Sequence, residues 1–151
     1  MSPRIHSIIN ILMFLSVVAI NYLSNALPLN GVTQGEISAR YPIPLTPAGY
    51  VFSIWGFIYL GLIAYIIAQA IPKNLNSPRL RSLDAPFRLS CLCNMLWLVV
   101  WHYDYVTLSL LLMFGLLGSL IWSYIRLDRA QMKQDAASRW FVETTFSTYL
   151  G

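Results

Sequence analysis

Four long apolar runs constrain this sequence more than any other feature. They cover approximately residues 7–27, 47–71, 85–103 and 105–125, and a fifth, shorter run covers residues 140–151. A helix that crosses a bilayer needs about 20 predominantly apolar residues. The runs therefore predict an all-α, polytopic transmembrane helix bundle that forms a single domain over residues 1–151. We expect its fifth helix to be incomplete in this sequence, because the last run is too short to span.

Composition supports a membrane protein. Only 11% of the residues are charged and 57% are hydrophobic, whereas an average soluble domain has about 25% charged residues. The formal net charge is +4, but the basic residues cluster between the apolar runs, as topology signals do. We therefore expect the lipid bilayer as a partner, and no nucleic acid.

The two cysteines, Cys91 and Cys93, lie inside an apolar run. No disulfide framework is expected from them. Residues two apart on a helix point to different sides, which makes this spacing a poor metal site. We therefore expect two small buried thiols, no metal site and no required cofactor.

The first run has two interpretations. Arg4 precedes it and Ser24 to Ala26 resemble a cleavage site, as in a signal peptide. The run is longer than the roughly 7–15 apolar residues of a signal core, which favours a retained helix. Asn10, Val17, Asn21 and Ser24 share one stripe of this helix. We expect the stripe to face the bundle, and hydrogen bonds between helices explain it better than ligand contact does.

The basic residues predict the orientation in the membrane. Nine of the ten Lys and Arg residues precede the first run or follow the second and fourth runs, and Arg40 lies alone in the loop 28–46. The positive-inside rule places the N-terminus and both basic connections in the cytoplasm, and this loop on the outer side. The loop is rich in Pro and Gly and is long for a connection, which predicts a pocket lid. Arg40 and Tyr41 suit an anionic or aromatic ligand, although an interfacial anchor explains them equally well.

Aromatic side chains follow one face of the second predicted helix. Thr46 and Pro47 are typical of a helix start. Phe52, Trp55 and Tyr59 follow at i, i+3 and i+7, so their rings project the same way. We expect this face to be a wall of a binding pocket if it meets other helices rather than lipid.

A second stripe in the third helix consists of Asn94, Trp97 and Trp101. An amide beside two indoles is costly toward lipid, so the stripe should face protein. It either lines the opposite wall of the pocket, which we favour, or packs helices with one hydrogen bond.

Three local features give further expectations. Asp84 is typical of an N-cap for the third helix. His102 and Asp104 fall in a short polar break and are expected to be solvated at the interface. Gly115 and Gly118 permit close approach between helices.

The motifs resemble the TspO/MBR family, the tryptophan-rich sensory or translocator proteins, and in particular a longer bacterial branch. Pro47, Phe52, Trp55 and Tyr59 are similar to its second-helix pattern, approximately P-x-W-x-F-x-x-x-W-x-x-x-Y. Its N-x-x-W and P-Y-L-x-W motifs correspond to Asn94 to Trp97 and to Tyr149 to Gly151. The chain departs from the pattern at Ser53-Ile54, which replace a proline-containing step, and at Tyr50, where many members have tryptophan. The fifth-helix tryptophan of the family would follow Gly151.

The resemblance implies a five-helix bundle in a membrane, here the bacterial cell membrane, with a pocket under the first loop. That pocket binds porphyrins, other tetrapyrroles or haem-type ligands and, in some members, sterols and drug-like aromatics. Family members often form homodimers, and no motif here decides that state. Carried over by motif, Trp55, Tyr59, Asn94 and Trp97 are the expected ligand-binding residues. The spacing adds Phe52, Trp101, Arg40 and Tyr41 as candidates.

We therefore expect a protein that binds porphyrin-like ligands as a sensor or carrier. No nucleophile–base set, metal cluster or phosphate loop emerges from the sequence, so an enzyme is the less favoured class. Two alternatives remain open. One is transport or regulation of a partner without ligand chemistry, and the other is light-dependent porphyrin degradation, which has been proposed for the family.

Overall fold

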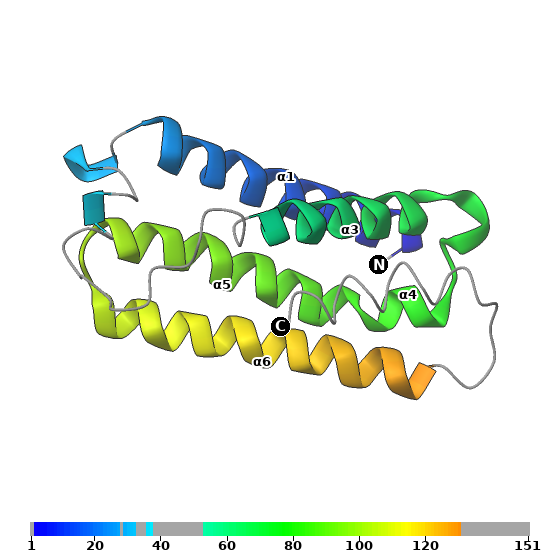
Figure 1. Ribbon diagram of the computed structural model, residues 1–151. Helices are drawn as coiled ribbons and strands as arrows, with labels where there is room; N and C mark the ends of the chain where they lie inside the picture. Colours follow the sequence, from blue (N-terminus) through cyan, green and yellow to red (C-terminus); the bar gives the residue numbers. More distant parts are fainter. Residues whose placement is uncertain (1, 28, 33–35, 38–52, 131–151) are drawn as a thin grey trace.

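The computed structural model describes residues 2–27, 29–32, 36–37 and 53–130 (Figure 1). Its elements are α1 (Pro3–Ala26), η1 (Leu29–Gly31), α3 (Ser53–Ala70), η3 (Pro72–Asn74), α4 (Pro78–Ser82), α5 (Asp84–His102) and α6 (Val106–Ala130). This part of the chain contains helices and no strand. The expected all-α class is confirmed.

Helix α5 lies at the centre of the bundle. It packs against α6 on one side and α1 on the other, and α3 packs on α1 (Figure 1). Apolar side chains from all four long helices, together with Leu80 and Leu83 from the connection between α3 and α5, form one buried core cluster. Helices α5 and α6 make the antiparallel hairpin that the short break at residues 102–105 predicts, with Asp104 at a positive φ of 61° in the turn.

The end of α3 agrees with the apolar run, whereas α6 extends beyond its run. Helix α3 ends at Ala70, before Pro72, as expected. Helix α6 continues to Ala130, beyond the apolar run, because the residues after 125 include neither Gly nor Pro. In this extension, the Arg126 guanidinium lies 5.6 Å from the centroid of the Trp122 ring, one turn earlier, in a cation–π contact. The expected helix start at residue 47 and the fifth helix lie outside the described residues.

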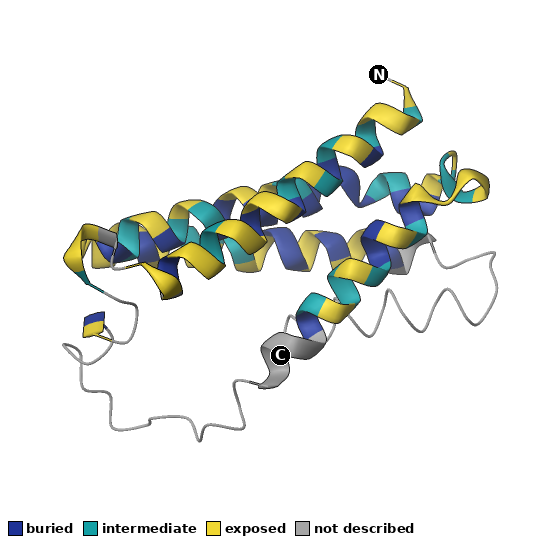
Figure 2. Ribbon diagram, turned by 90° about the horizontal axis from the view of Figure 1, so that it is seen from above, coloured by how far each residue is buried: buried dark blue, intermediate teal, exposed yellow. Residues whose placement is uncertain are grey.

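The outer faces of the bundle are apolar. Large hydrophobic side chains are exposed along α1, α5 and α6, and Figure 2 shows the exposed residues along the outside of the helices. Two segments, Pro3–Ser24 and Val106–Leu127, are long and apolar enough to cross a membrane, and Ile58–Ala70 is a shorter apolar helix. A water-soluble bundle places charged and polar residues on such faces. Lipid is the solvent that suits this surface.

The polar stripe of α1 faces the bundle, as expected. Asn10, Val17 and Ser24 are buried, and Asn21 is half-buried. Asn10 and Asn21 donate hydrogen bonds to side chains of α3 and α5. The preference for interhelical hydrogen bonds is therefore confirmed, and α1 is an integral part of the bundle.

The largest of these connections is a group of polar side chains at the end of the bundle that carries the N-terminus and α4. We call it the basal network. Its members are His6, Ser7, Asn10, Gln69, Arg81, Asp84 and Arg88.

Asn10 is the hub of the basal network. Its Nδ2 donates to Asp84 Oδ1 at 2.6 Å and to Gln69 Oε1 at 2.9 Å, and its Oδ1 accepts from Arg88 Nε at 2.6 Å. The side chain is fully buried. One amide thus joins α1 to α3 and, through two charged residues, to α5.

Asp84 is not the N-cap that the sequence predicts. The residue before α5 is Leu83, and no side chain caps the helix. The Asp84 carboxylate instead turns inward, where Arg81 Nη1 lies 3.3 Å and His6 Nδ1 3.1 Å from its Oδ2. The Arg81 guanidinium compensates a buried carboxylate better than a backbone N–H does, and this preference explains why the Asp84 side chain turns inward.

The two glycines of α6 behave differently. A Cβ atom at Gly115 would lie 3.2 Å from Cys93 Sγ, so α5 and α6 approach closely there, as expected. A Cβ at Gly118 would meet nothing within 4 Å, and the close approach expected there is wrong. Buried Ser109, Ser119 and Ser123 supply the other small residues on α6.

Asn10→Leu keeps a similar volume but removes the hub of the basal network. It leaves Asp84 Oδ1 and Arg88 Nε without their partner, so we expect the free energy of unfolding to fall by about 2–4 kcal/mol. Equilibrium unfolding in mixed micelles measures this. Ser16→Ala, which removes an exposed bond to Leu12 O on the same helix, is the control and should change the value by less than about 0.5 kcal/mol. Equal effects would contradict a central role for Asn10.

Gly115→Ala and Gly118→Ala form a matched pair on one helix. Gly118→Ala should gain about 1 kcal/mol of stability from helix propensity, since its new methyl group meets no atom. Gly115→Ala gains the same helix propensity, but its methyl group would lie too close to Cys93 Sγ. We therefore expect Gly115→Ala to be less stable than Gly118→Ala. The same unfolding assay compares them, and a more stable Gly115→Ala would disprove the close contact.

Candidate functional site

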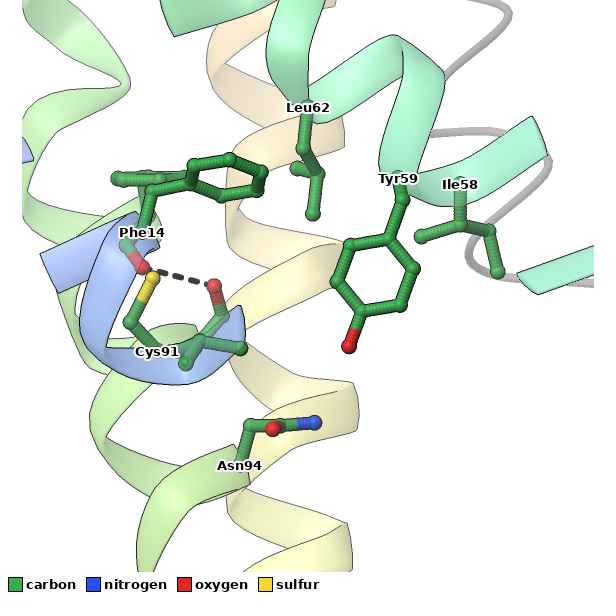
Figure 3. Close-up of a pocket in the computed structure, with 9 residues that line it drawn as sticks. Phe14, Ile58, Tyr59, Leu62, Cys91 and Asn94 are labelled. Carbon is green, nitrogen blue, oxygen red and sulfur yellow. Dashed lines mark hydrogen bonds between the residues drawn. The ribbon is translucent and has the colours of Figure 1, made fainter. Parts of the chain in front are cut away.

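A small cavity lies between α1, α3 and α5, near the middle of these helices (Figure 3). Its volume is about 20 Å³, enough for about one water molecule. The walls are mainly apolar, and the polar side chains come from α3 and α5. The lining residues are Phe14, Val17, Ile58, Tyr59, Leu62, Phe87, Ser90, Cys91 and Asn94.

Two of the expected site residues, Tyr59 and Asn94, meet at this cavity from different helices. The Tyr59 ring packs against Phe14 of α1, with ring centroids 6.5 Å apart and planes tilted by 59°. Figure 3 shows the Tyr59 hydroxyl on the side of the cavity where the Asn94 amide lies. The expected opposition of the second and third helix stripes therefore holds for this pair. Their role in binding remains a prediction.

A neighbouring amide fixes the orientation of Asn94. Asn21 Nδ2 donates to Asn94 Oδ1 at 3.0 Å and to Val17 O at 2.9 Å. Because Asn94 Oδ1 is the acceptor in this bond, its Nδ2 is the group left for another partner. Asn94 thus offers N–H donors at the wall of the cavity.

Trp97 and Trp101 lie next to each other on α5 but do not line the cavity. Their ring centroids are 6.4 Å apart, with planes inclined by 25°, which is a stacked arrangement. Trp97 Nε1 is buried and has no hydrogen-bond partner among the residues that the structure describes. An indole N–H without an acceptor is uncommon in a packed interior and marks a position where a polar group can be accommodated.

His102 is buried, with 1% of its surface exposed, and the expectation that it is solvated is wrong. Its Nδ1 lies 2.7 Å from Leu98 O. A carbonyl oxygen only accepts, so Nδ1 donates the proton of this bond. Nε2 is buried and has no hydrogen-bond partner in the described part of the chain. Asn30 Nδ2 donates to His102 O at 3.2 Å, which ties a described part of the first loop to this end of α5.

The other expected site residues lie wholly or partly outside the described residues. The backbone of Trp55 belongs to α3, but its side chain is outside the description. Phe52, Arg40 and Tyr41 lie outside the described residues altogether.

Sequence reasoning missed several lining residues, although the stripes already pointed to them. Phe14 lies between Asn10 and Val17 on the stripe of α1, and Leu62 follows Tyr59 by one turn. Phe87 and Cys91 precede Asn94 on the same face of α5. Extending each polar or aromatic stripe by one or two turns would have found them.

The described residues offer little reactive chemistry. Cys91 and Cys93 are free and buried, as expected. No group of three or more His, Cys, Asp or Glu side chains that could hold a metal ion occurs in the described ranges. What this region presents is aromatic surface with a few polar atoms, which suits binding.

The family model for TSPO-like proteins matches residues 7–151, nearly the whole chain. The chain belongs to the TspO/MBR family. Comparisons with curated proteins and with solved structures found no match. The family assignment, together with the two long apolar helices, makes this a helical membrane protein of the TspO kind.

Proposed function

We propose that this TspO/MBR protein binds a flat aromatic ligand of the porphyrin type between α1, α3 and α5, as a sensor or carrier. The observation that carries the proposal is that Tyr59 of α3 and Asn94 of α5 line one cavity in a member of this family. The aromatic rings supply stacking surface, and the amide supplies orientation.

Unpaired donors on α5 support the same site. Asn94 Nδ2 and the buried Trp97 Nε1 lie on one helix face, three residues apart. Both are donors, so a ligand with acceptor groups at its edge, such as carboxylates, satisfies them. A ligand without acceptor groups would leave both donors without a hydrogen-bond partner.

The cavity must widen to hold such a ligand. Pockets for drug-sized ligands have volumes of about 300–1,000 Å³, against about 20 Å³ here. Among the four long described helices, α3 packs most sparsely against the others, and α1 is its main long neighbour. Elements with few packing contacts open at the lowest cost. We therefore expect α3 to move away from α5 when the ligand enters.

The enzymatic and transport alternatives predict different measurements. Degradation requires light-dependent loss of a porphyrin absorption band that disappears in Trp55→Phe. Transport or partner regulation without a ligand site requires substrate flux or a copurifying partner, and no saturable porphyrin binding. Saturable binding in the dark, without loss of porphyrin, separates the proposed function from both.

The double variant Trp55→Phe with Trp97→Phe tests the site. Loss of two indole faces should raise the Kd for protoporphyrin by about tenfold, since an aromatic pair contributes about 0.5–1.5 kcal/mol. An absorbance titration of the purified full chain measures Kd without relying on the remaining tryptophans, and quenching of tryptophan fluorescence gives a second readout. Trp122→Phe, on the exposed face of α6, is the control. Unchanged affinity in the double variant would remove these residues from the site.

The two thiols report where the ligand binds. Cys91 lines the cavity, whereas Cys93 faces Gly115 of α6. Cys93→Ala leaves only the first thiol, and Cys91→Ala only the second. Protoporphyrin at ten times its Kd should slow methanethiosulfonate labelling of Cys91 by about tenfold, in proportion to occupancy. Labelling of Cys93 should not change, and equal protection of both would indicate general rigidification instead.

A further inference from the structure

The basal network carries more positive charge than its acceptors compensate. Arg81 and Arg88 each contribute a guanidinium, and Asp84 is the one carboxylate within the network. A buried or half-buried cation near lipid requires a counter-charge, because the hydrocarbon region provides none.

Arg88 shows where the uncompensated charge lies. Its Nε donates to Asn10 Oδ1 at 2.6 Å, and its Nη2 lies 3.2 Å from His6 O and 3.1 Å from His6 Nδ1. These contacts hold one edge of the guanidinium. Among the described residues, Nη1 has no hydrogen-bond partner. The fork is therefore fixed by the protein while two N–H donors remain available.

Gln69 shows that the network lacks acceptors. The Asp84 carboxylate accepts only, so the Asn10 amide must turn its Nδ2 toward it. The same Nδ2 also donates to Gln69 Oε1, which fixes the direction of the Gln69 amide. Gln69 Nε2 is left buried, and no described residue accepts a hydrogen bond from it. The Gln69 donor lacks an acceptor, and the Arg88 guanidinium lacks a counter-charge. An anionic group with acceptor oxygens would supply both.

The open edge of Arg88 lies near the end of the bundle. Arg88 is four residues into α5, about 6 Å along the helix axis from its first residue. His6 is in the first turn of α1, and its side chain is 30% exposed. In a membrane-spanning bundle, positions this close to the helix ends lie at the level of the lipid headgroups rather than in the hydrocarbon centre.

We propose that Arg88 Nη1, beside His6, binds the phosphate of an anionic phospholipid headgroup. Guanidinium groups bind phosphate with two N–H donors and a fixed fork, and basic pockets between transmembrane helices bind lipid headgroups. The phosphodiester supplies the negative charge that the network lacks. A zwitterionic headgroup brings its own cation and compensates less. This site is at the opposite end of the bundle from Asn30 and His102, and it is independent of the proposed porphyrin site.

Native mass spectrometry of the full chain tests the proposal. The protein is released from micelles that contain equal amounts of phosphatidylglycerol and phosphatidylcholine, and each bound lipid is counted. The wild type should prefer phosphatidylglycerol. Arg88→Gln should lower that preference by about fivefold, the contribution of one basic side chain at an anionic surface.

Arg126→Gln is the matched control. Arg126 is exposed near the end of α6, where the neighbouring Leu127 packs in the same core cluster as Leu80 and Leu83. This variant removes one charge at the same end of the bundle without touching the basal network, and it should keep the wild-type preference. An unchanged preference in Arg88→Gln, or an equal loss in Arg126→Gln, overturns the proposal.

Two further measurements keep the test decisive. If inorganic phosphate binds in an Arg88-dependent way while phosphatidylglycerol does not, the ligand is a free anion and the lipid proposal is wrong. If Arg88→Gln does not fold, a photoactivatable phosphatidylglycerol analogue is used with the wild type. It should crosslink to peptides that contain His6 or Arg88, and crosslinks confined to other regions overturn the site.

Discussion

The burial of the Asp84 carboxylate is the constraint on which the described bundle depends. A carboxylate at 5% exposure in a membrane bundle is tolerated only when charged and hydrogen-bonding partners surround it. Those partners come from α1, in His6 and Asn10, and from α4, in Arg81. Because these directional contacts join three elements, they fix the register of α1 and α4 against α5 at this point. With this register fixed, the apolar side chains of α1 and α5 farther from the basal network are also aligned with one another.

Helix α3 is held differently from its neighbours. At the basal end, Gln69 joins it to Asn10 and Ser7 through its side chain and its carbonyl. Above that point it contacts α1 through apolar pairs such as Tyr59 with Phe14. Apolar contacts are not directional, so they resist sliding or tilting less than a hydrogen-bonded end does. A helix anchored at one end and loosely packed above is suited to widening the cavity beside Tyr59 without disturbing the basal network.

The sequence predicted the general architecture and the direction of the polar stripes, because helix length and periodicity determine both. Asn10, Asn21 and Asn94 all face protein, as their cost toward lipid requires. Asp84 and His102 were predicted wrongly for a common reason. Local rules describe a side chain by its neighbours in sequence, whereas Asp84 and His102 have contacts from residues far away in the chain, Asn10 and Asn30 respectively. The stripes could have been extended to the lining residues Phe14 and Leu62, but the cavity itself exists only where α1, α3 and α5 meet.

The polar atoms of α5 divide into two groups with different consequences. At its start, Asp84 contacts residues of α1 and α4, and Arg88 donates to α1 through Nε and Nη2. Toward its other end, Trp97 Nε1 and His102 Nε2 are buried with no partner in the described ranges. A buried polar atom without a partner costs about 1–3 kcal/mol, and an apolar residue of similar size would avoid that cost. Packing alone therefore does not account for Trp97 and His102. Water can supply a hydrogen-bond partner to each of these atoms.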